Sequence, residues 1–314
     1  MTKISMTPTG ESGSAYENYN KRHDDYDLTR LPVGVEQVAQ YLRDWRNPSE
    51  LSLLDAGCGT GLHLQYFNQL GLARLIGMDA SIIGVAQAAQ KFAHLKDEAT
   101  HLELEAKAAH LAAEAPHKPI LLVGDFRAIP LPDQSLDVVH VSFAVHHLPH
   151  KSEAELKQAT RDLFAEFARV LKPGGKLIVV STSRTQLHPQ QGSLWYYRYF
   201  QDAARVLAKR FLPRRDLVAS MHEAGFETVT TQLVQKTYWT AASLDANGPF
   251  DEHWRNGDSL FAFYRDKQEL LQKRLARLKQ LIADGSVQKH IAATRQRTES
   301  VKQAYILVAT RTGS

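Results

Sequence analysis

Three glycines at alternate positions form the motif whose spacing points most directly to chemistry. They are Gly57, Gly59 and Gly61 in the segment LLDAGCGTG, which follows an apolar run and precedes a helical pattern. Glycine permits a tight turn and a close approach of a ligand, and the N-terminus of the following helix offers free N–H groups with partial positive charge. Leu62 stands where a dinucleotide-binding loop requires glycine. With Asp55 ahead of it, the loop can instead receive the amino-acid end of a ligand; the alternative is a purely structural turn.

Two further acidic residues follow the next two predicted strands. Asp79 ends the second strand about 20 residues beyond the loop, where an acid accepts hydrogen bonds from ribose hydroxyls. Asp125, in the sequence Gly124-Asp125-Phe126, offers a carboxylate and a neighbouring backbone N–H to the edge of a purine. Each acid alone could cap a helix. Their shared place at the carboxyl ends of neighbouring strands, where doubly wound folds bind ligands, predicts a nucleoside-bearing ligand.

Two adjacent histidines, His146 and His147, follow the fourth predicted strand and are therefore expected at the same edge of the sheet. An imidazole titrates near neutral pH and can remove a proton from an oxygen or nitrogen atom of a substrate. We predict that one of them acts as a general base. The alternative is a role in packing alone.

Aromatic residues are frequent in the second half of the chain. Trp and Tyr present a flat apolar surface with a polar tip, so they can hold an apolar or aromatic substrate or stabilise a cation. The alternative is that they dock one part of the protein on another. The candidate substrate contacts are Trp195, Tyr196, Tyr199, Trp239 and Trp254.

The elements that must position these residues alternate between strands and helices, which predicts an α/β fold with a parallel, doubly wound sheet. A helical pattern from Ser81 to Ala115 is longer than usual and is expected to break near 94–100. Two final strands are expected to pair in antiparallel fashion. The predicted strands are 51–56, 73–79, 120–125, 136–143, 176–183, 226–238 and 304–310, and the other predicted helices are 36–45, 61–70, 152–171 and 214–224.

The order of these elements predicts one principal domain over residues 49–314, preceded by an N-terminal lid segment over residues 1–48. Two stretches do not fit the strand–helix alternation, 184–213 and 239–303. We interpret both as helical cap insertions in the main domain.

The net charge of +4 is unevenly distributed along the chain. The segment from Arg198 to Arg215 carries +5 and the segment from Arg265 to Arg311 carries +7, which leaves −8 for the remainder. Such basic segments are either solvated helix faces or surfaces that attract an anionic substrate, RNA or an acidic membrane.

A single cysteine, Cys58, excludes intrachain disulfides and thiolate metal clusters, so no metal is expected. The N-terminal residues lack the apolar region of a secretory signal, and no apolar run is long enough for a membrane span. The expected location is the cytoplasm.

Five stretches together resemble the class I (Rossmann-like) S-adenosylmethionine-dependent methyltransferases. They are LLDAGCGTG, IGMDAS, VGDFRAIPLPDQSLDVVHVSFAVHHL, FARVLKPGGKLIVV and HEAGF. The resemblance is to the methyltransferase type 11 group, which includes ubiquinone/menaquinone C-methyltransferases and trans-aconitate methyltransferases. It implies a seven-stranded sheet of order 3-2-1-4-5-7-6 with strand 7 antiparallel, and S-adenosylmethionine as cofactor.

The resemblance also assigns residues to parts of the cofactor. It implies that the loop from Gly57 to Gly61 holds the methionine part, Asp79 the ribose, Ala80 the adenine face, and Asp125 with Phe126 the adenine edge. An N-terminal tyrosine or Arg30 is expected near the methionine carboxylate. The full predicted cofactor set is Tyr26, Arg30, Asp55, Gly57, Cys58, Gly59, Gly61, Asp79, Ala80, Asp125, Phe126, Ser142 and Phe143.

The function expected from the sequence is methyl transfer to an oxygen or nitrogen atom of a small molecule, aromatic or anionic, with His146 or His147 as the base. The basic, aromatic-containing cap leaves an RNA methyltransferase as an alternative. A methyltransferase-like scaffold without activity is a second alternative, which the intact glycine loop and acids disfavour. The substrate, the methylated atom and the oligomeric state stay open.

Overall fold

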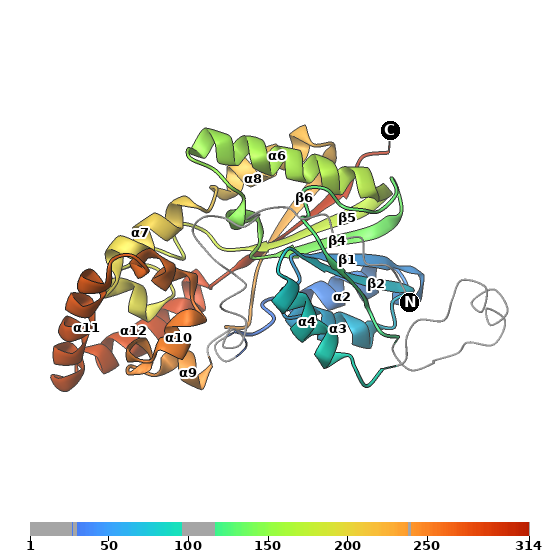
Figure 1. The fold of residues 1–314 in the computed structure, drawn as a ribbon. Coiled ribbons are helices and arrows are strands. Elements are labelled where there is room, and N and C mark those ends of the chain that lie inside the picture. The colour runs from blue at the N-terminus through green and yellow to red at the C-terminus, as the bar shows by residue number, and fades with distance from the viewer. Residues whose placement is uncertain (1–26, 28–29, 96–116, 238–239, 314) are drawn as a thin grey trace.

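Seven strands form one sheet in the order β3-β2-β1-β4-β5-β7-β6, in which only β7 runs antiparallel to its neighbours (Figure 1). This confirms the predicted topology. The computed structural model describes residues 27, 30–95, 117–237 and 240–313. The strands are β1 (Ser52–Ala56), β2 (Arg74–Asp79), β3 (Ile120–Val123), β4 (Leu136–Ser142), β5 (Leu171–Ser181), β6 (Phe226–Leu233) and β7 (Tyr305–Arg311).

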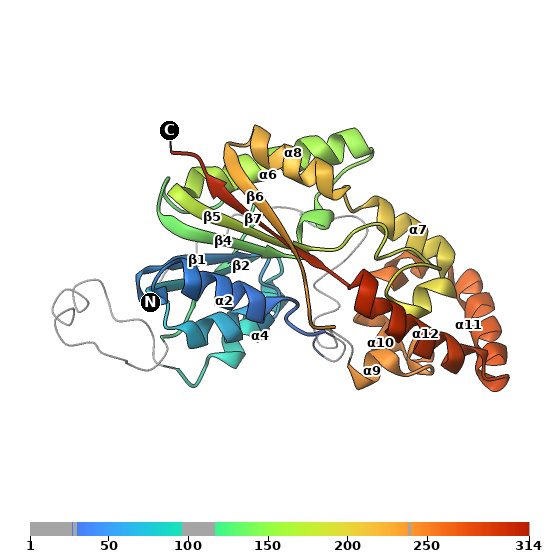
Figure 2. The same ribbon diagram turned by 180° about the vertical axis from the view of Figure 1, so that it is seen from behind.

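Helices cover both faces of the sheet because successive strand residues point to opposite sides. Leu54 and its alternate neighbours pack with α6 (Glu153–Val170) and α8 (Arg214–Glu223). Leu53 packs on the other face with α2 (Val35–Trp45) and α3 (Leu62–Phe67), beside α4 (Ile82–Lys91). Figure 2 shows the same layers from behind, with α6 and α8 on one side of the sheet and α2 and α4 on the other. Within the described residues, no helix is both long and apolar enough to cross a membrane.

The two segments interpreted as insertions lie together in a helical cap beside the sheet (Figures 1 and 2). Their apolar residues share one core, which contains Phe200 from the first segment and Leu278 from the second. In the first segment Trp195–Arg198 form a single 3-10 turn, and the α-helix starts only at Gln201. The cap consists of η5 (Trp195–Arg198), α7 (Gln201–Lys209), α9 (Ala241–Leu244), η6 (Gly248–Phe250), α10 (Glu252–Asn256), η7 (Ser259–Tyr264), α11 (Gln268–Ala283) and α12 (Ser286–Val301).

Several element boundaries differ from the sequence-based expectation. The strand predicted over 226–238 ends at Leu233. The third strand ends at Val123, before the predicted end at Asp125. The helix that begins after Ser81 ends at Lys91, and residues 96–116 of the predicted long helix lie outside the described residues. The fifth strand begins at Leu171, before the predicted start at residue 176, because Leu171 already pairs with Leu136 before a register shift brings Lys176 opposite Val138.

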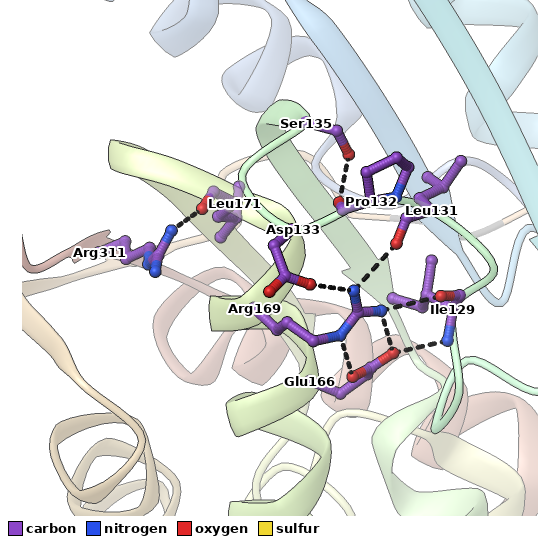
Figure 3. Close-up of polar contacts among 9 residues, drawn as sticks. All are labelled: Ile129, Leu131, Pro132, Asp133, Ser135, Glu166, Arg169, Leu171 and Arg311. Atoms are coloured by element: carbon purple, nitrogen blue, oxygen red, sulfur yellow. Dashed lines mark hydrogen bonds and ion pairs between the residues drawn. The ribbon is translucent and has the colours of Figure 1, made fainter.

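An arginine on α6 holds the loop between β3 and β4 in place (Figure 3). Arg169 forms two hydrogen bonds with Glu166 (2.7 and 2.8 Å), pairs with Asp133 (2.7 Å), and donates to the carbonyl oxygens of Ile129 and Leu131 (2.8 and 2.9 Å). Glu166 in turn accepts from the backbone N–H of Ile129 at 2.6 Å. These contacts fix the far end of the loop that begins at the predicted adenine-binding residues.

Candidate functional site

The glycine loop leaves β1 and enters α3 with all three glycines in the left-handed region. Their φ angles are +79° at Gly57, +52° at Gly59 and +82° at Gly61. A Cβ atom on Gly57 would lie 2.7 Å from the Cβ of Ala144, whereas a Cβ on Gly59 would meet no atom of the described residues within 4 Å. The first glycine is therefore required by packing, and the second by its backbone angle. Among the described residues, the space beside Gly59 is open.

Asp79 ties the loop to the neighbouring element. One carboxylate oxygen accepts from the backbone N–H of Gly59 and the other from that of Ser81, both at 2.8 Å. Burial raises the pKa of Asp79, while these two hydrogen bonds favour the ionised form. Ala80 follows and is exposed. The carboxylate lies at the carboxyl end of β2, next to the loop, as the ribose-binding prediction requires.

Asp125 and Phe126 follow the end of β3, where the adenine-edge prediction needs a carboxylate and a backbone N–H. The Asp125 carboxylate pairs with Arg127, whose Nε lies 2.8 and 3.0 Å from its two oxygens. The Phe126 ring packs inward, 6.3 Å from the ring of Phe167, so only its backbone N–H could meet a purine. Arg127 was not among the predicted site residues, although its spacing of two residues from Asp125 is a local signal that could have identified it.

Asp55 does not lie free in the loop. It is 1% exposed, and its Oδ1 is 2.8 Å from Nδ1 of His140, the residue beside it on β4. The ring of His63, from the first turn of α3, lies 5.0 Å from that of His140. Oδ2 of Asp55 is buried and has no hydrogen-bond partner among the described residues, so it can still accept from the predicted ammonium group. Nothing in the sequence pattern indicated the pairing with His140.

The predicted cysteine of the loop is packed rather than reactive. Cys58 is buried, and burial together with the nearby charges of Asp55 and Asp79 raises the pKa of its thiol. Its backbone N–H donates to the carbonyl oxygen of Met78 at 3.0 Å. Its contribution is therefore the shape of the loop and not a thiolate.

The described part of the N-terminal segment contacts both the loop and the cap. Asp27 accepts from Thr60 Oγ1 in the glycine loop and pairs with Lys91, both at 2.6 Å. Arg30 donates from Nε to the carbonyl oxygen of Gly257 in the cap at 2.9 Å. Tyr26 lies outside the described residues. This segment therefore links the loop with the cap, and Arg30 reaches the cap side.

The end of β4 lies where sheet and cap meet. Phe143 has a φ of +48°, a strained angle for a residue of its size, and its N–H donates to Val180 at 3.0 Å. Its ring packs against both the sheet core and the cap core. The hydroxyl of the preceding Ser142 is buried and has no partner among the described residues.

The paired histidines form a 3-10 turn just beyond β4. Their ring centroids are 3.8 Å apart, and His146 stacks on Phe211 with centroids 4.2 Å apart and planes at 20°. His146 is buried. Burial lowers its pKa well below the ordinary value, helped by the nearby charges of His147, Arg210 and Arg30. The imidazole of His146 is thus neutral at neutral pH and keeps a free electron pair.

The cap aromatics pack mainly among themselves. Trp195 is fully buried and donates from Nε1 to the carbonyl oxygen of Ser243 at 2.8 Å. Trp254 donates likewise to Ala242 at 2.7 Å. The Tyr196 hydroxyl bonds to Asp258, and that of Tyr199 to His290; Trp239 lies outside the described residues. Trp195 has no surface left for a substrate, which corresponds to the docking alternative.

The chain is similar in sequence to known methyltransferases. Residues 54–179 match the family model described as a methyltransferase domain. The chain is 23% identical over 237 residues to a demethylmenaquinone methyltransferase of Shouchella clausii, covering 69% of this chain and 89% of that protein. It is 32% identical over 122 residues to the ubiquinone/menaquinone biosynthesis C-methyltransferase of Bordetella avium, covering 33% and 42%.

A solved structure has the same fold over nearly the whole chain. It is a putative methyltransferase from an antibiotic biosynthesis pathway of Anabaena variabilis, with a TM-score of 0.62 and 21% sequence identity. The match covers 90% of this chain and 98% of that one. At this level of identity the likeness bears on the fold alone.

Proposed function

Because residues 54–179 match a methyltransferase domain, we propose that this chain is an S-adenosylmethionine-dependent methyltransferase that methylates an oxygen or nitrogen atom of a small molecule. The observation that carries the proposal is the buried, neutral His146 at the end of β4. It lies between the sheet that carries the glycine loop and the cap residue Phe211. A neutral imidazole beside the cofactor suits an acceptor that arrives protonated.

The residues around the loop fit the cofactor. Gly59 leaves open space beside the loop among the described residues, and Oδ2 of Asp55 is a buried acceptor that an ammonium group would satisfy. We assign the ribose hydroxyls to Asp79. The adenine is assigned to Ala80, Asp125 and the backbone of Phe126, with Ser142 and Phe143 beside the reacting end.

When bound, the cofactor supplies an electrophilic methyl group on a sulfonium. The protein contributes positioning and exclusion of water, which together account for much of the barrier reduction in such displacements. The N-terminal segment with Arg30, the turn of His146 and the cap side of Phe211 enclose the acceptor. His146, or His147 beside it, takes the proton that the acceptor loses.

A carbon atom is the second candidate acceptor, since relatives at 23% and 32% identity are named as methyltransferases of quinone biosynthesis. The same histidine would then remove a proton from an adjacent hydroxyl group. This candidate also keeps the substrate within the class of small molecules.

The test of the acceptor class is methyl transfer from labelled cofactor into two pools from the same cells, a small-molecule extract and total RNA. We expect label in the small-molecule pool, in a product whose label is absent when His146→Gln protein is used. Label found only in RNA, and lost when Arg205 and Lys209 are changed to Gln, would establish the RNA alternative.

The position of His146 and His147 just beyond β4 leads to a prediction about turnover. We expect His146→Gln, or His147→Gln, to lower turnover by roughly 10²–10⁴-fold while the Kd of S-adenosylhomocysteine stays within about twofold. Because the pKa of His146 is lowered, the acid limb of kcat/KM against pH should lie below pH 6.5. The exposed His94→Gln is the matched control. Equal losses of cofactor affinity and of rate would indicate packing.

A further inference from the structure

The cap contains a pocket of about 210 Å³ that unites the two basic segments of the sequence. Arg198 comes from η5 in the first segment, and Arg274 and Arg277 come from one face of α11 in the second. The pocket therefore exists only because the two insertions pack together. In Figures 1 and 2, α11 lies on the outer side of the cap, away from the sheet.

Positive charge in this pocket exceeds negative charge. Arg274 pairs with Asp202 at 2.9 Å, and the partner of Arg277 within the described part of the chain is the neutral Gln280, at 3.1 Å. The exposed guanidinium of Arg198 has no hydrogen-bond or ion-pair partner among the residues that the structure describes. The other nearby carboxylate, Asp284, accepts from the N–H of Ser286 at the start of α12.

The rest of the pocket is apolar or neutral. Leu278 is buried at its base, beside the partly buried Leu281. The ring of Tyr199 stands edge-on to His290, with centroids 5.5 Å apart and its hydroxyl 3.1 Å from Nδ1. Burial, with the charges of Arg198 and Arg297, lowers the pKa of His290 to about 4. At neutral pH His290 is thus uncharged and adds nothing to the positive charge of the arginines.

Three guanidinium groups around so small a space repel one another, and a bound anion removes that repulsion. Arginine matches the oxygen atoms of phosphate with its planar fork of N–H donors, and its weak hydration lowers the cost of binding. We propose that this pocket binds the phosphate group of a small phosphorylated ligand at a site separate from methyl transfer. The bound phosphate bridges the two insertions and so stabilises the cap.

The test uses the full chain and inorganic pyrophosphate as the probe, at about 0.15 M salt to screen diffuse attraction. Calorimetry and thermal unfolding are compared for wild type, Arg198→Gln/Arg277→Gln, and the control Lys273→Gln/Lys279→Gln. Both double variants remove two exposed charges, and the control changes α11 outside the pocket. Circular dichroism establishes that each variant is folded.

We expect saturable binding to wild type and to the control with Kd values within about twofold of each other, and at least about tenfold weaker binding to the arginine variant. Pyrophosphate should raise the Tm of wild type and control but not of the arginine variant. Absence of saturable binding, or equal loss in both double variants, would overturn the proposal. So would tight binding of an RNA oligonucleotide without binding of pyrophosphate, which would indicate a nucleic-acid surface.

Discussion

Asp79 holds the glycine loop in place and is also the residue predicted to bind the ribose of the cofactor. Its two oxygens accept from the N–H groups of Gly59 and Ser81, so it joins the glycine loop to the start of α4. A carboxylate oxygen can accept more than one hydrogen bond, and the ribose hydroxyls can therefore be added without breaking these contacts. The residue thus shapes the site before the cofactor enters.

We expect Asp79→Asn to weaken binding of S-adenosylhomocysteine by at least about tenfold, because charge-assisted hydrogen bonds contribute roughly 1.5–3 kcal/mol each. The amide has only one accepting oxygen and cannot receive both N–H groups and the ribose. Calorimetry measures the effect, with the exposed Asp44→Asn on α2 as the control. Wild-type affinity in Asp79→Asn would remove this residue from the site.

At the scale of elements, the loop between β3 and β4 is held by a charged contact to α6 rather than by secondary structure of its own. Arg169 satisfies two loop carbonyl groups and one loop carboxylate, and Glu166 binds a loop N–H (Figure 3). Because the same loop contains Asp125, Arg169 and Glu166 also help to hold the predicted adenine site in position.

Arg169→Gln is expected to reduce the free energy of unfolding by about 1–3 kcal/mol, since it leaves loop carbonyl groups without partners. The hydrogen bond from Arg169 lowers the pKa of Glu166, so this stabilisation is present above the unfolded pKa and is lost as the pH falls through the folded pKa. Urea unfolding at pH 7 and pH 4 should thus show a smaller difference between variant and wild type at pH 4. The control is Arg161→Gln, on α6 like Arg169, which breaks an exposed pair with Glu223 of α8 and should cost under about 0.5 kcal/mol.

The whole molecule consists of a sheet layer and a cap, joined by the N-terminal segment and by the ends of β4 and β5. His63 lies between the segment that precedes α2 and the sheet. Its Nε2 is 3.3 Å from the carbonyl oxygen of Val33, and its ring packs on His140 of the sheet. Burial, with the charge of His140, lowers the pKa of His63 to about 4. The folded protein therefore keeps this histidine neutral where an unfolded chain would protonate it.

The sign of the pH dependence follows from this difference. Between about pH 4 and pH 6.5 the unfolded chain binds the extra proton, so stability falls as the pH is lowered, by up to about 1.4 kcal/mol per pH unit for this group. His63→Gln should show a shallower decline in denaturant unfolding measured from pH 6.5 to 4.5. The exposed His94→Gln should keep the wild-type slope, and an unchanged slope in His63→Gln would contradict the assignment.

Local patterns in the sequence were enough to predict much of the sheet and of the loop. The positive φ angles required at Gly57, Gly59 and Gly61, and the apolar runs of the strands, depend on neighbours in the chain. The alternation of strands and helices predicted a parallel sheet, and the resemblance implied its strand order. Asp79 could be placed beside the loop because the carboxyl ends of parallel strands share one edge.

The partners of buried side chains were decided only by the tertiary structure. The pairing of Asp55 with His140 joins positions 85 residues apart, and the burial of Trp195 depends on Ser243 from the other insertion. The basic pocket likewise combines Arg198 with Arg277. Periodicity and turn chemistry are set over a few residues, whereas these contacts arise only when distant segments pack against each other. The sequence by itself therefore determined the fold and the position of the glycine loop, and packing decided which side chains lie at the carboxyl edge of the sheet and which hold the cap together.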